Sequence, residues 1–251
     1  MATKKRPKRS TIKTYEQAWQ RYSTWCESEG HDPLDADPAT VVAFVNAMND
    51  RGLKMSTIRL TCASVTHFHK RHGLADPTKH EPVRDALAWA QEDADADESR
   101  AETSATPLTK DLLERVLAVS AIPRSCESPA HAATRHAEMS AVLRLMFDSA
   151  LRCDEASRAR WSWLGEPDDM GRRDLRIPAS KTGKRTGHVS RRTAEALDRW
   201  RATSPDPDGR ITTAPTTTAL AARIKRLGQR AGVELSGHSA RHGVLTSCAE
   251  N

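Results

Sequence analysis

The sequence predicts a mainly α-helical protein with two domains and one small β-hairpin. Apolar residues recur every three or four positions in both halves of the chain, which is the period of a helix packed on a core. Residues 92–102 carry six acidic side chains and no apolar stripe, which is typical of a solvated linker. Residues 174–190 alternate apolar and polar side chains around a Thr182-Gly183 turn, which indicates two short strands.

Four helical segments are expected in a first domain over residues 1–95. Asp37 is placed to cap the second segment, and Pro38 suits its first turn because the N–H that proline lacks would be unpaired there anyway. Glycines end the first three segments. The segments run from Ile12 to Gly30, from Pro38 to Gly52, from Ser56 to Gly73, and from Pro82 onward.

An acidic linker is expected over residues 96–106, followed by a second domain over 107–251. Limited proteolysis is expected to cut the linker first, because that stretch lacks apolar anchors. In the second domain, Thr109 is placed to cap a first helix, and a longer helix contains Val142 and Leu145. After the hairpin, helices are expected at 191–202, 217–230 and 238–248.

The composition bounds the location and the class of site. Mean hydropathy is −0.65, and no apolar run is long enough to span a bilayer. The basic start MATKKRPKRS leads into no apolar segment, so it does not resemble a secretion signal. We therefore expect a cytoplasmic location and no membrane partner. The five cysteines form no CxxC pair, which argues against disulfides and zinc knuckles. His238 and His242 have the spacing of two zinc ligands, but no Glu follows His238 and no third ligand is evident. We therefore predict no metal.

Positive charge favours a polyanionic partner. The net charge is +6 and the isoelectric point about 9.2, and residues 1–10 carry five positive charges with no negative one. His67, His69 and His72 spread over different helix faces, so a solvated or phosphate-facing surface is predicted there instead of a metal site.

Four side chains of the second domain suit phosphodiester chemistry. The two guanidiniums, on Arg152 and Arg241, can each bind nonbridging oxygens, and a lysine or histidine can donate a proton to a leaving oxygen. Each residue alone has a plainer explanation: Arg152 can form a surface ion pair with Glu155, and Lys181 can be an ordinary hairpin-tip charge. The candidates in chain order are Arg152, Lys181, His238 and Arg241.

The order and context of these residues resemble the tyrosine recombinase (phage integrase) family over nearly the whole chain. TIKTY near the start, STI in the third helix and DPT at 76–78 resemble its core-binding domain. ALRCDEASRARWSWL resembles its first arginine box, SKTGK its hairpin lysine, and GHSARHG its His-x-x-Arg box. The resemblance implies a SAM-like four-helix domain, then a mainly α catalytic-type domain with a small sheet.

The resemblance also implies roles. Arg152 and Arg241 would bind the scissile phosphate, His238 would hydrogen-bond it, Lys181 would be the general acid, and Glu155 would support the arginine helix. Lys184 could substitute for Lys181. The family needs no metal or nucleotide cofactor, so none is expected, and the expected partners are double-stranded DNA and other recombinase protomers. Further DNA contacts are predicted at Lys4, Lys5, Arg6, Lys8, Arg9, Lys13, Arg59, His67, Lys70, Arg71, Lys184 and Arg185.

The family's nucleophilic tyrosine has no counterpart after GHSARHG. The two tyrosines of the sequence, Tyr15 and Tyr22, lie in the first domain, and we expect the catalytic-type domain to be truncated. The function expected is site-specific recombination and integration, through DNA binding without independent strand cleavage. Two alternatives remain open: an active recombinase subunit with a tyrosine supplied in trans, and an unrelated basic helical DNA-binding regulator.

Overall fold

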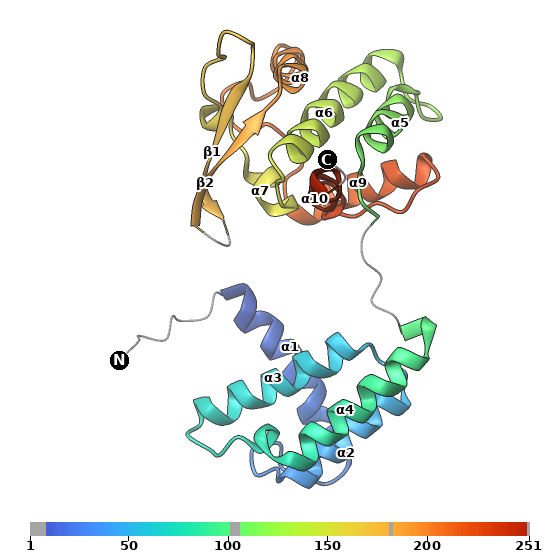
Figure 1. Cartoon of the computed structure of the whole chain (residues 1–251), viewed down its shortest axis with the longest axis vertical. Helices are drawn as coiled ribbons and strands as arrows, with labels where there is room; N and C mark the ends of the chain where they lie inside the picture. The colour runs from blue at the N-terminus through green and yellow to red at the C-terminus, as the bar shows by residue number, and fades with distance from the viewer. Residues whose placement is uncertain (1–8, 101–105, 181–182, 250–251) are drawn as a thin grey trace. The chain divides into compact units, whose positions relative to one another are not determined.

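The computed structural model describes residues 9–100, 106–180 and 183–249, and its contacts divide the chain into two units, Met1–Thr103 and Ser104–Asn251 (Figure 1). Each unit has its own hydrophobic core. Within the described ranges, no helix is long and apolar enough to cross a membrane. The mainly helical class with a two-stranded sheet, predicted from the sequence, is confirmed.

The described part of the first unit is a bundle of four α-helices. Helix α1 packs on α3, and α2 packs on α4. Asp37 caps α2 as predicted, because its side chain accepts a hydrogen bond of 2.7 Å from the N–H of Thr40. Tyr22 and Phe44 meet edge to face in the core, with ring centroids 5.0 Å apart. The helices are α1 (Arg9–Ser28), α2 (Pro38–Asp50), α3 (Met55–Arg71) and α4 (Glu81–Ala96).

The first unit extends past the predicted boundary at residue 95. Helix α4 runs to Ala96, a 3-10 turn covers Glu98–Arg100, and Arg100 is buried. Its Nη2 donates hydrogen bonds to Asn49 Oδ1 at 2.8 Å and to the carbonyl of Leu53 at 2.9 Å. The sequence assigned residues 96–100 to the linker by their acidity, and a single anchoring arginine binds part of that stretch to the bundle.

The second unit surrounds its core with six helices and one antiparallel hairpin among the described residues. Thr109 caps α5 as predicted, and its hydroxyl accepts from the N–H of Leu112 at 3.3 Å. The strands pair Arg173 with Val189 and Ile177 with Arg185. The elements are α5 (Lys110–Ala121), α6 (Pro129–Asp148), α7 (Cys153–Arg158), β1 (Arg173–Ser180), β2 (Gly183–Val189), α8 (Arg191–Arg201), α9 (Thr217–Arg230) and α10 (Ser239–Ala249).

Helix α10 lies against the start of the second unit at a glycine. The N–H of Leu108 donates to the carbonyl of Ser239 at 2.9 Å, and a Cβ added at Gly243 would collide with the backbone carbonyl of Leu108. Because backbone cannot move aside as a flexible side chain can, the Gly243→Ala substitution should lower the free energy of unfolding by about 2 kcal/mol.

The matched control is Gly165→Ala, where the nearest atom to the added Cβ lies 3.5 Å away, an ordinary contact. Urea unfolding of both variants measures the difference. If the two variants are equally stable, the close approach of α10 to residue 108 is wrong.

Candidate anion-binding site

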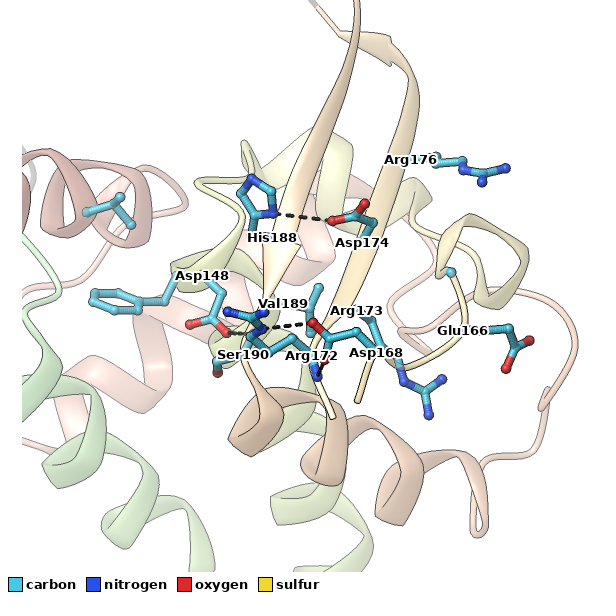
Figure 2. A pocket seen from close by; sticks show the side chains of 13 residues that line it. Asp148, Glu166, Asp168, Arg172, Arg173, Asp174, Arg176, His188, Val189 and Ser190 are labelled. Atoms are coloured by element: carbon cyan, nitrogen blue, oxygen red, sulfur yellow. Dashed lines mark hydrogen bonds and ion pairs between the residues drawn. The ribbon is translucent and has the colours of Figure 1, made fainter. Parts of the chain in front are cut away.

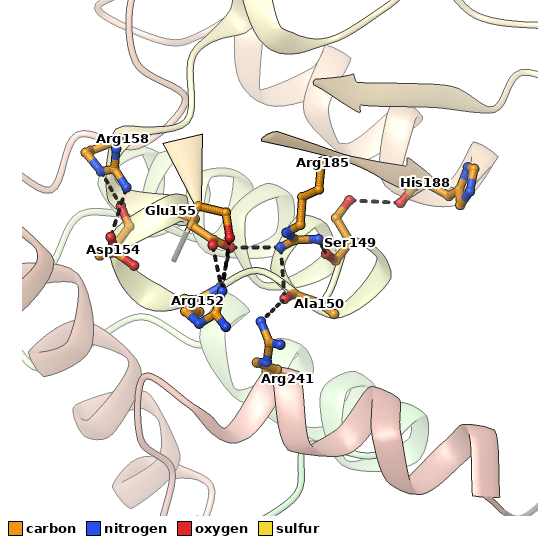
Figure 3. Close-up of polar contacts among 10 residues, drawn as sticks. Ser149, Ala150, Arg152, Asp154, Glu155, Arg158, Arg185, His188 and Arg241 are labelled. Carbon is orange, nitrogen blue, oxygen red and sulfur yellow. Dashed lines mark hydrogen bonds and ion pairs between the residues drawn. The ribbon is translucent and has the colours of Figure 1, made fainter. Parts of the chain in front are cut away.

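Arg152 and Glu155 are brought together by a sharp turn between α6 and α7 (Figure 3). Ala150 has φ +46°, in the left-handed region, and the next helix begins after Arg152. The backbone N–H of Arg152 donates to Glu155 Oε2 at 3.0 Å, and its Nη1 donates to Glu155 Oε1 at 3.0 Å. The same Nη1 lies 3.2 Å from Ser180 Oγ at the end of β1. Glu155 therefore holds both the backbone and the side chain of Arg152.

Arg185 on β2 is the second arginine bound to Glu155. Its Nη2 donates to Glu155 Oε2 at 2.8 Å and to the carbonyl of Ala150 at 3.2 Å, while its Nη1 donates to the carbonyl of Ser149 at 2.8 Å. Arg185 was predicted only as a further DNA contact, and its place beside Glu155 was not anticipated. The alternation of side chains along β2 could have predicted this position, because Arg185 lies on the same face of the strand as the buried Gly187 and Val189.

Arg241 completes the cluster from α10. Its Nη1 lies 3.5 Å from the carbonyl of Ala150, which also accepts from Arg185 (Figure 3). Burial lowers the pKa of Arg241, and the charges of Arg152 and Arg185 lower it further, so the three guanidiniums repel one another. One carboxylate faces three arginines. We call Arg152, Glu155, Arg185 and Arg241 the arginine cluster.

Glu155 keeps its charge despite being 1% exposed. Burial alone would raise its pKa, but hydrogen bonds from the Arg152 backbone and from the side chains of Arg185, Ser180 and Arg152 lower it to about 2. The carboxylate is thus ionised near neutral pH and fixes two arginines, and the cluster retains an excess of positive charge that suits an anion.

The two remaining predicted site residues are His238 and Lys181. His238 is exposed in the turn before α10, which begins at Ser239, so it precedes the helix on which Arg241 lies. This turn approaches α7 because residue 237 is a glycine, whose added Cβ would lie 2.8 Å from Cys153 Cβ. Lys181 lies outside the described residues, between the two strands, and the neighbouring Lys184 is exposed on β2.

Of the predicted DNA contacts of the first unit, those that the structure describes are mostly exposed. Lys4, Lys5, Arg6 and Lys8 lie outside the described residues, whereas the exposed ones are Arg9, Lys13, Arg59, Lys70 and Arg71. Lys70 Nζ also forms an ion pair of 3.4 Å with Asp76 Oδ2. His67 is half-buried with its ring 5.1 Å from that of Tyr15.

The prediction of a solvated or phosphate-facing surface is wrong for His69. That residue is 2% exposed, and its Nδ1 lies 3.0 Å from the carbonyl of Val65. The cause is helix phase: His69 follows the buried Val65 by four residues on α3, so both face the core.

A cavity of about 910 Å³ lies beside the hairpin, but it suits an anion less well than the arginine cluster does (Figure 2). Acidic and basic side chains line it together and bind one another. His188 Nδ1 lies 3.2 Å from Asp174 Oδ1, and Arg172 Nε lies 2.9 Å from Asp168 Oδ2. Its charges are therefore largely compensated, whereas those of the arginine cluster are not.

One curated relative matches part of the sequence. The chain is 28% identical over 81 residues to an integrase/recombinase XerD homolog of Selenomonas ruminantium, a segment that spans 32% of this chain and 23% of that protein. No family model matches the sequence.

Solved structures resemble the chain along almost its whole length. The post-cleavage complex of the XerH site-specific recombinase with palindromic difH substrate has a TM-score of 0.66 at 15% identity, covering 96% of this chain and 70% of that one. The Tn1549 transposon integrase in complex with transposon right end DNA also has a TM-score of 0.66, at 14% identity, covering 97% of this chain and 82% of that one. These findings confirm the resemblance to the tyrosine recombinases, and the chain has the fold of that family.

Proposed function

We propose that the chain is a DNA-binding protein of the tyrosine recombinase and integrase type, and that its arginine cluster binds a phosphate of double-stranded DNA. The proposal rests on three arginines, from the N-cap of α7, from β2 and from α10, that lie near one buried carboxylate. A guanidinium fork fits the nonbridging oxygens of a phosphodiester, and an anion between the three forks relieves their mutual repulsion.

The resemblance to the tyrosine recombinases suggests the role of each residue. Arg152 and Arg241 bind the phosphate, and Glu155 acts as a positioning residue through its hydrogen bonds to Arg152 and Arg185. His238, exposed in the turn before α10, supplies a hydrogen bond to the phosphate, and Lys181 is the proton donor to the leaving oxygen. The exposed basic residues of the first unit bind neighbouring phosphates.

A salt titration tests DNA binding. We expect the purified 251-residue protein to bind a fluorescein-labelled duplex at low salt. The affinity should fall at least about 100-fold between about 50 and about 200 mM NaCl, because cationic contacts release condensed counterions. Absence of binding at low salt, or an affinity indifferent to salt, would contradict the proposal.

Neither tyrosine within residues 1–251 is expected to form a covalent bond with DNA. Tyr22 is fully buried in the first core, and burial raises its pKa, both of which disfavour a nucleophilic phenolate. Tyr15 packs its ring against His67. Incubation of the polypeptide with nicked suicide duplexes should therefore give no denaturant-resistant protein–DNA band.

The matched variants are Tyr15→Phe and Tyr22→Phe. A band that forms with the unmodified polypeptide and disappears in either variant identifies a relocated nucleophile and overturns this expectation. A band that appears only after a second, tyrosine-bearing recombinase is added supports a nucleophile supplied in trans.

A further inference from the structure

A second arginine-rich hollow lies at the opposite end of α6 from the arginine cluster. It has a volume of about 300 Å³ and is lined by Arg124, Arg135, Arg223 and Arg226 over a floor that includes Trp200 and Leu227. Arg135 precedes Ser149 by fourteen residues along α6, which corresponds to about 20 Å at the helical rise. This hollow, which we call the α6–α9 pocket, is therefore separate from the site described above.

Two of the pocket arginines are already neutralised. Arg135 donates from Nε and Nη2 to the two carboxylate oxygens of Glu127, each at 2.8 Å, and from Nη1 to the carbonyl of Ser120. Arg223 donates from Nη1 to Glu138 Oε1 at 3.0 Å, and Glu138 also accepts from Thr213. These ion pairs build the wall of the pocket.

The other two pocket arginines, Arg124 and Arg226, and Arg230 outside the pocket lining have no ion pair within the part of the chain that the structure describes. Arg226 uses Nε on the carbonyl of Ala222, which leaves its two terminal nitrogens for other partners. Arg230 donates from Nη2 to the carbonyl of Ile122 at 2.9 Å, and its Nη1 is buried with no hydrogen-bond partner. Arg124, the third, carries no side-chain ion pair in the described ranges.

The positive charge around Arg124 is only partly compensated. Burial lowers the pKa of Arg124, and the charges of Arg135, Arg230 and Arg226 lower it further, while the carboxylate of Glu127 opposes them. Like charges held close together are a costly arrangement that an anion in the pocket would relieve.

We propose that the α6–α9 pocket is a second anion site, which binds a phosphate group between Arg124 and Arg226. Two guanidiniums without a carboxylate partner match the charge of a phosphate better than that of a single carboxylate, and their forked donors fit its oxygens. The volume is at the small end of ligand pockets, so it suits a compact phosphate-bearing group. This inference does not depend on the proposed DNA contact of the arginine cluster.

The phosphate could belong to a small compound or to a DNA backbone, and one experiment separates the two sources. Inorganic pyrophosphate is titrated into the 251-residue protein by isothermal calorimetry at constant ionic strength. We expect saturable binding that weakens at least about tenfold in the Arg124→Gln/Arg226→Gln double variant, because two charge-assisted contacts are lost.

Lys225→Gln is the matched control. It removes one positive charge from the same helix, adjacent to Arg226, and Lys225 lines a different hollow, with Gln229 and Gly232. The Arg152→Gln/Arg241→Gln variant reports binding at the arginine cluster. Both of these proteins should keep the pyrophosphate site. Absence of saturable binding, an equal loss in Lys225→Gln, or a loss confined to Arg152→Gln/Arg241→Gln would each overturn the proposal.

A final titration adds a saturating 30-base-pair duplex as competitor. If the duplex displaces pyrophosphate and Arg124→Gln/Arg226→Gln weakens duplex binding, the pocket binds a backbone phosphate. If both bind together and duplex affinity is unchanged in that variant, the pocket binds a small phosphate compound. Either result supports a phosphate site.

Discussion

Replacing Glu155 by glutamine should lower the free energy of unfolding of the second unit by about 3 kcal/mol at pH 7. The carboxylate is 1% exposed and holds Arg152 and Arg185 by hydrogen bonds of 2.8 to 3.0 Å. Glutamine keeps the shape but removes the one negative charge among three guanidiniums, so those charges lose their counterion. Urea unfolding, followed by tryptophan fluorescence, measures the loss.

The matched control is Glu195→Gln, which breaks an exposed ion pair of 2.9 Å with Arg191. Exposed pairs of this kind contribute about 0.5 kcal/mol or less, so the control should be almost as stable as the parent protein. Equal stability of Glu155→Gln and Glu195→Gln would contradict the role assigned to Glu155.

The same carboxylate predicts a dependence of stability on pH. The pKa of Glu155 falls from an ordinary 4.5 to about 2 in the folded protein. Because the pKa is lower in the folded protein, the ionised carboxylate stabilises the folded state at pH values above the unfolded pKa. That contribution, about 3 kcal/mol, is lost as the pH falls from 4.5 toward 2. The Glu155→Gln variant lacks this contribution. Its free energy of unfolding should therefore fall less steeply than that of the parent protein over this pH range. If the two proteins lose stability in parallel, the lowered pKa of Glu155 is wrong.

Replacing Arg241 by glutamine should weaken binding to duplex DNA by about 10- to 100-fold, because a charge-assisted contact to a phosphate is lost. The fold should not suffer, since the hydrogen bond of Arg241 to Ala150 is long, 3.5 Å, and its neighbours Arg152 and Arg185 repel it. Anisotropy titrations measure the affinity, and thermal unfolding checks the stability.

Arg191→Gln serves as the control for charge removal, because Arg191 lies outside the cluster and already pairs with Glu195. It should change the affinity by less than about threefold. If both variants bind DNA equally well, Arg241 is not a phosphate ligand. If Arg241→Gln unfolds at a much lower temperature, its role is structural.

The elements of the fold were predictable because their signals are local. Asp37 and Thr109 cap helices at the positions that their sequences indicate, and the strands that end at Ser180 and begin at Gly183 pair as expected. Residues 96–100 were assigned to the linker because their acidic composition is a local signal that contains nothing about distant contacts. The anchor that ties them to the bundle, Arg100 on Asn49 and Leu53, joins positions about fifty residues apart, which composition does not encode.

The candidate site was predictable by residue type and only partly by geometry. The family resemblance supplied Arg152, Glu155 and Arg241, but the inward position of Arg185 depends on strand register and on the carbonyls of Ser149 and Ala150. The direction of those carbonyls depends on Ala150, which has left-handed backbone angles. Because this residue is not a glycine, the sequence does not indicate that conformation. Nonlocal placement of this kind requires the folded structure.

Arg152 and Arg241 are proposed to converge on a single phosphate, and the slope of log affinity against log salt distinguishes one shared phosphate from two. Each phosphate that a protein neutralises contributes about 0.9 to that slope for duplex DNA. The Arg241→Gln variant should keep the parent slope, because Arg152 still neutralises the phosphate. The Arg152→Gln/Arg241→Gln variant should have a slope shallower by about 0.9. An unchanged slope in the double variant, or a drop of about 1.8 that signals two separate phosphates, would contradict the account.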